Sequence, residues 1–222
     1  DAREGGEPVV RELLTKGVRF GSITVDPDGT IDTSSLEGVD DDLVIRPFQQ
    51  KGVVVSLREF SVKAMNSHFG MQASELFRDG LDVDGDGVAD ELTRGDITAL
   101  VLSMATAPVP GRVMPAHPQA RAAVTRGEQL FAEVGCSVCH VPELRLDNAV
   151  FTEPSPFNPG GKLRPGDVPQ PFSADLTSAG PGPHLAREPD GSVMVPAFTD
   201  LKRHDMGGRL DTDMMKQGVI PT

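Results

Sequence analysis

The most constraining feature of this chain is a five-residue string that contains both of its cysteines, Cys136-Ser137-Val138-Cys139-His140. The C-x-x-C-H spacing is the attachment signature of c-type haem, in which two thiols bond one porphyrin edge and the following histidine binds the iron. The string therefore predicts a covalent haem c that is attached at Cys136 and Cys139, with His140 as an iron ligand.

Two other uses of a cysteine pair are less well supported. A redox-active dithiol is expected beside a βαβ pattern, which the sequence does not display. A structural zinc site needs four ligands and usually a second Cys or His pair, which the chain lacks. The residues before the motif favour haem, because 120–135 is predicted to form a helix that ends at Gly135 and leads directly into the cysteines.

Composition fits a fold built around a bound group. Only 38% of the residues are hydrophobic, and the 222 residues include 24 glycines, 19 prolines, no Trp and no Tyr. This is a loop-rich chain with little apolar material, so a cofactor that supplies core volume would help it fold. We expect a mainly α-helical fold with long irregular loops, little β structure and one or more cytochrome c-like haem domains.

Charge and hydropathy exclude two classes of partner. The net charge of −12 argues against binding to nucleic acid. The sequence has no run of 18 apolar residues, so a membrane-spanning helix is not expected.

Local patterns predict the order of elements along the chain. Helices are expected at 7–20, 56–69 and 94–106, and a β-hairpin at 20–32 turns at Asp26-Pro27-Asp28-Gly29. The proline-rich stretch 153–196 is expected to form long irregular loops rather than a sheet. Prolines after 107 mark a boundary between an N-terminal helical region, 1–107, and a cytochrome c-type haem domain, 108–222.

An acidic loop precedes the helix expected at 94–106. Carboxylates at every second position can converge on one hard cation, while Gly87 permits a sharp turn. The twelfth position holds Thr93 instead of the usual glutamate, so a closing ligand would have to come from Glu91. The loop predicts a structural calcium site, and the alternative is an acidic surface turn that caps the next helix. The candidate ligands are Asp82, Asp84, Asp86, Val88, Asp90 and Glu91.

Seven stretches carry a family resemblance, in the order 43–48, 51–52, 56–60, 68–72, 82–87 with 91–93, 127–140 and 198–207. Together they resemble the bacterial di-haem cytochrome c peroxidase superfamily, in its branch of di-haem, thiol-oxidoreductase-like peroxidases. That family carries two C-x-x-C-H motifs, whereas this chain has one, which resembles the second. The resemblance therefore implies a piece that lacks the first haem motif, with the second haem on a segment absent from this chain.

The resemblance implies a c-type haem oxidoreductase that transfers electrons to a peroxide-type oxidant. Its partners would be an electron-donor or electron-acceptor protein and a companion chain that carries another haem. The alternative is a non-catalytic single-haem electron carrier, or a subunit of a larger cytochrome assembly. Because haem c is attached outside the cytoplasmic membrane, we expect a periplasmic or extracellular protein.

Individual roles follow with their alternatives. The sixth iron ligand is expected to be Met206, His204 or a residue elsewhere. The alternative for Met206 and His204 is that they belong to a turn that touches the haem edge without binding iron. His68 is expected to bind the second haem, and Glu75 to act as the acid–base group for peroxide cleavage. The alternative is that His68 only ends a helix and that Glu75 is a solvated surface residue. Arg46 and Arg58 would bind haem propionates or form surface salt bridges.

Overall fold

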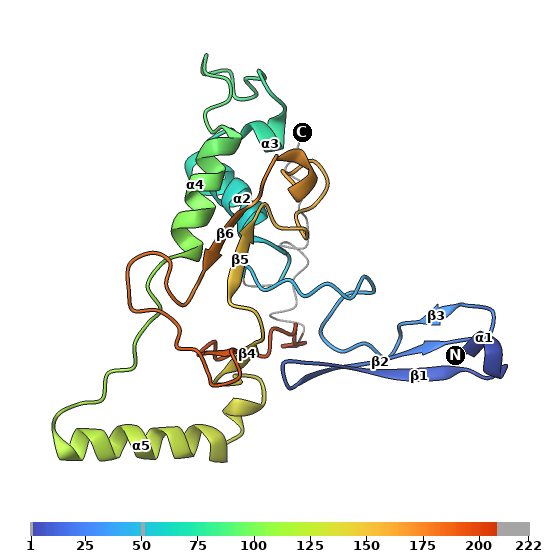
Figure 1. Ribbon diagram of the computed structural model, residues 1–222, viewed down its shortest axis with the longest axis vertical. Helices are drawn as coiled ribbons and strands as arrows, with labels where there is room; N and C mark the ends of the chain where they lie inside the picture. Colours follow the sequence, from blue (N-terminus) through green and yellow to red (C-terminus); the bar gives the residue numbers. More distant parts are fainter. Residues whose placement is uncertain (1, 50–51, 208–222) are drawn as a thin grey trace. The chain divides into compact units, whose positions relative to one another are not determined.

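The computed structural model describes residues 2–49 and 52–207 (Figure 1). These residues belong to two compact units. Each unit collects separate segments of the chain. The first comprises 1–38, 108–149 and 180–202, and the second comprises 39–107, 150–179 and 203–222, as far as these residues are described. The chain passes from the second unit to the first between residues 107 and 108, where a domain boundary was expected. The division into consecutive domains 1–107 and 108–222 stays a prediction.

The first unit begins with α1 (Ala2–Gly5) and a three-stranded antiparallel sheet, in the order β1 (Val9–Thr15), β2 (Val18–Val25) and β3 (Ile31–Asp32). The helix expected at 7–20 is therefore wrong. Lys16 and Gly17 take positive φ angles of 53° and 77°, and Thr15 pairs with Val18. Two positive φ angles are what a two-residue hairpin turn requires. The expected return after the Asp26–Gly29 turn is confirmed by β3.

The same unit contains α5 (Pro118–Glu133), η1 (Cys136–Val138) and a two-stranded sheet of β4 (Leu144–Leu146) and β7 (Val193–Val195). α5 confirms the helix expected at 120–135. Gly135 lies just beyond its end with a φ of 86°. This left-handed conformation commonly terminates a helix.

The described part of the second unit contains three α-helices, a short η helix and a two-stranded sheet. These are α2 (Leu57–Phe69), α3 (Ser74–Phe77), α4 (Arg94–Ala105), β5 (Val150–Glu153), η2 (Pro165–Asp167) and β6 (Phe172–Asp175). α2 and α4 confirm the helices expected at 56–69 and 94–106. Ser56 caps α2 by accepting a hydrogen bond from the amide of Glu59, and Thr93 and Asp96 cap α4 reciprocally.

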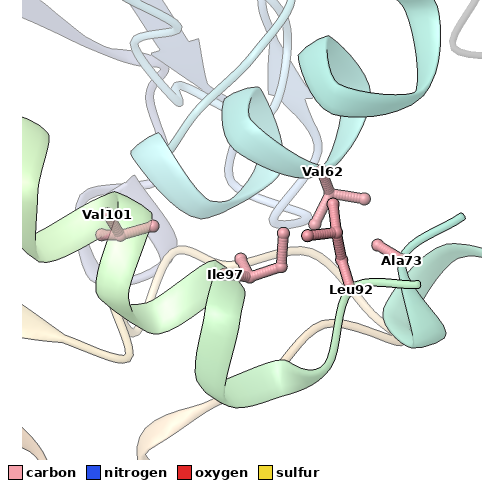
Figure 2. Packing of buried hydrophobic residues seen from close by; sticks show 5 residues of the cluster. All are labelled: Val62, Ala73, Leu92, Ile97 and Val101. Atoms are coloured by element: carbon pink, nitrogen blue, oxygen red, sulfur yellow. The ribbon is translucent and has the colours of Figure 1, made fainter. Parts of the chain in front are cut away.

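The hydrophobic core of the second unit lies where α2 and α4 pack together (Figure 2). Val62 of α2 and Ile97 and Val101 of α4 are fully buried. Ala73 and Leu92, from the segments that precede α3 and α4, complete the cluster. This core fixes the two ends of the segment 73–92, which includes the acidic loop.

The expected fold class is wrong. The chain is 27% helical and 18% strand, with small antiparallel sheets, so within the described residues it is mixed α/β rather than mainly α with little β. Two strands, β6 and β7, also lie in the stretch 153–196 that was expected to contain no sheet. Each pairs with a segment before Pro154, and such distant pairing has no local periodicity by which it could be detected.

The expected absence of a membrane-spanning helix is confirmed for the described part of the chain. Among residues 2–49 and 52–207, no helix has both the length and the apolar character needed to cross a bilayer.

Candidate functional site

The cysteine motif forms one tight helical turn. The amide of Val138 donates to the carbonyl of Gly135 at 3.1 Å, and the amide of His140 donates to the carbonyl of Cys136 at 3.0 Å. Positions i and i+3 of such a 3₁₀ turn lie above one another, so Cys136 and Cys139 present their side chains on one side. Both cysteines are exposed. The arrangement suits two thiols that bond one edge of a flat group.

His140 is held by a backbone carbonyl. Its Nδ1 lies 3.1 Å from the carbonyl oxygen of Phe198. Because a carbonyl only accepts, this contact requires the imidazole proton on Nδ1 and leaves the lone pair on Nε2. Nε2 is then the atom available to bind a metal, as is usual where a carbonyl fixes the tautomer of a ligating histidine.

The carbonyl of Phe198 belongs to a segment that follows the motif, residues 198–202, which we name the strap. The amide of Phe198 lies 3.4 Å from the carbonyl of Pro142, and the amide of Asp200 donates to the carbonyl of Cys139 at 3.0 Å. At its far end, Lys202 donates to the carbonyl of Arg19 at 3.1 Å and to Glu37 Oε2 at 3.0 Å. The strap therefore ties the motif to β2 and to the segment that follows the hairpin.

Apolar side chains lie exposed around the motif. None of the sixteen residues of α5 is buried, although the helix is amphipathic. Val134 and Val138 are 70% and 75% exposed, and the ring of Phe131 lies within 6.3 Å of the rings of both His140 and Phe198. An apolar surface gathered beside two thiols and a histidine suits a flat apolar ligand such as a porphyrin.

The candidates for the sixth iron ligand lie in the other unit. His204 and Met206 are both exposed, in the segment that begins at Arg203. The choice between them, or of a ligand elsewhere, stays a prediction.

Glu75 lies in a buried ion-pair network. Arg58 is fully buried, and its Nη1 donates to Glu75 Oε2 at 2.9 Å while its Nε donates to Glu153 Oε1 at 2.5 Å. The other carboxylate oxygen of Glu75 accepts a hydrogen bond from the amide of Leu163 at 3.0 Å. Both carboxylate oxygens of Glu75 thus accept hydrogen bonds. Arg58 forms a buried ion-pair network, so it makes neither the propionate contact nor the surface salt bridge that were expected.

Burial shifts two pKa values around this network. Removal from water raises the pKa of Glu153, although Arg58 opposes the shift by stabilising the carboxylate. Burial likewise lowers the pKa of Lys162. The Nζ atom of Lys162 donates to the carbonyl of Glu75 at 2.7 Å. The network therefore holds one arginine against two carboxylates, and burial favours the protonated form of Glu153.

His68 lies in the last turn of α2, and its side chain is exposed. The helix ends two residues later at Gly70, in a left-handed conformation. Its expected role as a ligand of a second haem stays a prediction, as does the expected acid–base role of Glu75.

The acidic loop brings three carboxylates together. One oxygen from each of Asp82, Asp84 and Asp86 lies within 4.8 Å of the others. Asp82 also accepts hydrogen bonds from the amides of Gly85 and Gly87, at 2.7 and 2.9 Å. These bonds lower the pKa of the Asp82 carboxyl. The cluster therefore offers carboxylate oxygens at a spacing that suits a calcium ion.

The remaining calcium candidates have other contacts. Asp90 accepts from the amide of Gly80 at 2.8 Å, and Glu91 accepts from the amide of Gln72 at 2.7 Å. Val88 is exposed, and its amide donates to Asp86 at 2.8 Å. In this structure Asp90 and Glu91 anchor the loop to the segment before it, and their expected role as calcium ligands stays a prediction.

Sequence patterns missed the partner of His140. Phe198 lies 58 residues beyond the histidine, and a backbone carbonyl leaves no trace in residue identity. The signal in the sequence was indirect: the stretch 198–207 stood out by resemblance, without a role for Phe198.

Comparison with models of protein families, with curated proteins and with solved structures gives no match for this chain.

Proposed function

We propose that this protein carries one haem c, bonded to Cys136 and Cys139 with His140 as a ligand, and transfers electrons as an oxidoreductase of the di-haem peroxidase type. The observation that supports the proposal best is the contact between His140 Nδ1 and the carbonyl of Phe198 at 3.1 Å. It leaves Nε2 of a C-x-x-C-H histidine in the form that binds iron.

The residues around the motif have distinct tasks. The turn from Cys136 to Cys139 presents two thiols for attachment, and the strap fixes the imidazole. Apolar residues around the motif, above all Val134 just after α5 and Val138 in η1, would cover a ring face and keep water from it. A bound haem supplies reversible one-electron transfer at its iron.

Location and partners follow from the same proposal. Covalent haem c is assembled outside the cytoplasmic membrane, so the protein would work in the periplasm or outside the cell. Its partners would be a protein that donates or accepts electrons and a companion chain with a second haem. The cluster of Asp82, Asp84 and Asp86 would hold a calcium ion with a structural role.

A second candidate function is that of a non-catalytic electron carrier. It is favoured by the position of Glu75, whose two carboxylate oxygens bind Arg58 and the amide of Leu163. A general acid–base group must reach the reacting oxygen, and a buried, fully bonded carboxylate is poorly placed to do so.

The test is peroxide-dependent oxidation of the haem-loaded protein, expressed in a bacterium that attaches haem c. The reduced protein is mixed with hydrogen peroxide, and its absorbance is followed by stopped flow. Rapid oxidation, linear in peroxide concentration, is expected for the oxidoreductase. Slow oxidation despite rapid exchange with a small redox mediator would contradict peroxide reduction and favour the carrier.

Glu75→Gln separates the two roles of Glu75. Because Glu75→Gln breaks a buried ion pair, a lower unfolding midpoint is expected for either role, and the rate separates them. A loss of roughly 10²-fold or more in the peroxide rate of the folded variant is expected of an acid–base group. A lower midpoint with an unchanged rate would assign Glu75 to the ion-pair network alone. Glu133→Gln, on the exposed end of α5, is the matched control.

A further inference from the structure

The backbone of Phe198 has an unusual conformation at the point where it meets His140. Its φ angle is 48°, and Leu201, three residues later in the strap, has a φ of 59°. Both lie in the left-handed region that residues other than glycine rarely adopt. Such conformations persist only where surrounding contacts hold them, and they cluster at functional sites.

Those contacts are present on both sides of Phe198. The amides of Phe198 and Asp200 bond the carbonyls of Pro142 and Cys139, at 3.4 and 3.0 Å. Lys202 holds the end of the strap through the carbonyl of Arg19 and the carboxylate of Glu37. The strap is therefore fixed at both ends, and the left-handed turn directs the carbonyl of Phe198 at the imidazole.

The side chain of Phe198 has a separate environment. The residue is 54% exposed, and its ring lies edge-on to the ring of Phe131, with centroids 6.3 Å apart. The hydrogen bond to His140 uses only the backbone carbonyl. Substitutions can thus remove the ring while either favouring or opposing the left-handed backbone.

We propose that Phe198 is a positioning residue, whose left-handed backbone holds its carbonyl on Nδ1 of His140 and so sets the tautomer, orientation and basicity of the iron ligand. The inference rests on the proposed haem attachment. A carbonyl that accepts the Nδ1 proton makes the imidazole a stronger electron donor, and this favours ferric over ferrous iron. The hydrogen bond is therefore expected to lower the reduction potential.

Two variants test this backbone role. Phe198→Gly removes the ring but adopts a positive φ without strain, whereas Phe198→Val removes the ring and disfavours that conformation strongly. Phe172→Val, an exposed phenylalanine in β6 of the other unit, is the matched control. Each haem-loaded protein is titrated spectroelectrochemically, and the Nδ1 proton of His140 is followed by NMR in the reduced, diamagnetic state.

The expected result is a higher reduction potential and a faster-exchanging Nδ1 proton in Phe198→Val, with wild-type values in Phe198→Gly and in the control. Equal behaviour of the Gly and Val variants would overturn the proposal, because the backbone conformation would then have no effect. If Phe198→Val does not fold, Phe198→Ala takes its place, and a potential indistinguishable from that of Phe198→Gly overturns the proposal.

Failure of the proposed function has a different signature. The pyridine haemochrome assay gives the covalent haem content of the wild-type protein before any variant is compared. Absence of covalent haem there removes the basis for both proposals. A full haem content with no difference between Gly and Val at position 198 removes only the positioning role.

Discussion

Arg58 and Glu75 form a buried ion pair, in which Nη1 lies 2.9 Å from Oε2 and at most 1% of either side chain is exposed. Arg58 binds Glu153 as well, so one guanidinium joins α2, α3 and the end of β5. These elements surround the only core cluster found among the described residues. The network therefore holds together the second unit, which carries the acidic loop.

Replacing Arg58 by methionine is expected to destabilise the protein strongly. Two carboxylates would remain buried without their cation, and breaking such a pair typically costs about 3–5 kcal/mol. Urea denaturation measures the change in the free energy of unfolding. Arg94→Met is the control, because its pair with Asp79 is exposed and long. A loss of only about 0.5 kcal/mol is expected for the control, as for other exposed ion pairs. Equal losses in the two variants would show that burial of the Arg58 network does not matter.

The raised pKa of Glu153 predicts a pH-dependent contribution to stability. The native state binds the Glu153 proton more tightly than the unfolded chain, so this contribution is greatest below the ordinary glutamate pKa and is lost as the pH rises through the raised pKa. Glu153→Gln lacks it. The unfolding free energy of Glu153→Gln minus that of the wild type should therefore increase from about pH 4 to about pH 7.

The same comparison removes the effect of other carboxyls. Hydrogen bonds from Ser192 lower the pKa of Asp190, and hydrogen bonds from Thr93 lower the pKa of Asp96. These two carboxyls therefore make stability rise with pH, the opposite of the effect of Glu153. Their contribution is the same in the wild type and in Glu153→Gln, so it cancels in the difference. A difference between the two proteins that is constant or decreases with pH would contradict a raised pKa for Glu153.

The acidic loop is expected to bind calcium with Asp84 as a ligand. Asp84 contributes little to the fold of the loop, since its carboxylate accepts a long hydrogen bond from the amide of Asp86 at 3.3 Å. Asp84→Asn should therefore weaken calcium binding roughly tenfold or more while leaving the loop intact. Isothermal titration of the EGTA-treated protein measures the affinity. Asp79→Asn is the control, and a calcium affinity that is absent, or equal in the two variants, would refute this site.

Gly21 is expected to tolerate no side chain. Its φ is 80°, and a Cβ there would lie 2.0 Å from the carbonyl oxygen of Ser35. Gly17, with a φ of 77°, has no atom within 4 Å of the same position. Gly17→Ala should cost roughly 1 kcal/mol from backbone strain alone, and Gly21→Ala about 3 kcal/mol or more. Chemical denaturation distinguishes them, and similar losses would mean that the close approach of Ser35 does not limit the side chain at position 21.

Local signals explain which elements were predictable. Ser56 and Gly70 at the ends of α2, and Thr93 with Asp96 at the start of α4, act within a few residues, so both helices could be located from the sequence. The hairpin of β1 and β2 was missed, because Val9, Val10, Leu13 and Leu14 also fit a helical spacing. Lys16-Gly17 was the decisive signal, since both residues take the positive φ of a tight hairpin turn.

Long-range contacts explain what could not be predicted. Arg58 and Glu153 are 95 residues apart, and His140 and Phe198 are 58 apart. From the sequence, Arg58 was expected to bind haem propionates or to form surface salt bridges. Its burial could not be predicted, because it depends on distant segments that enclose the side chain. The cysteine motif could be interpreted from the sequence because all of its residues lie within five positions of the chain.

The mass of the denatured protein tests the proposed haem attachment most directly. After expression in a bacterium that attaches haem c, intact-protein mass spectrometry should give the polypeptide plus one haem. Replacement of both Cys136 and Cys139 by serine should give the bare polypeptide. A wild-type protein that has the mass of the bare polypeptide, in cells whose own cytochromes c carry haem, would contradict the assignment of the motif and the function proposed from it.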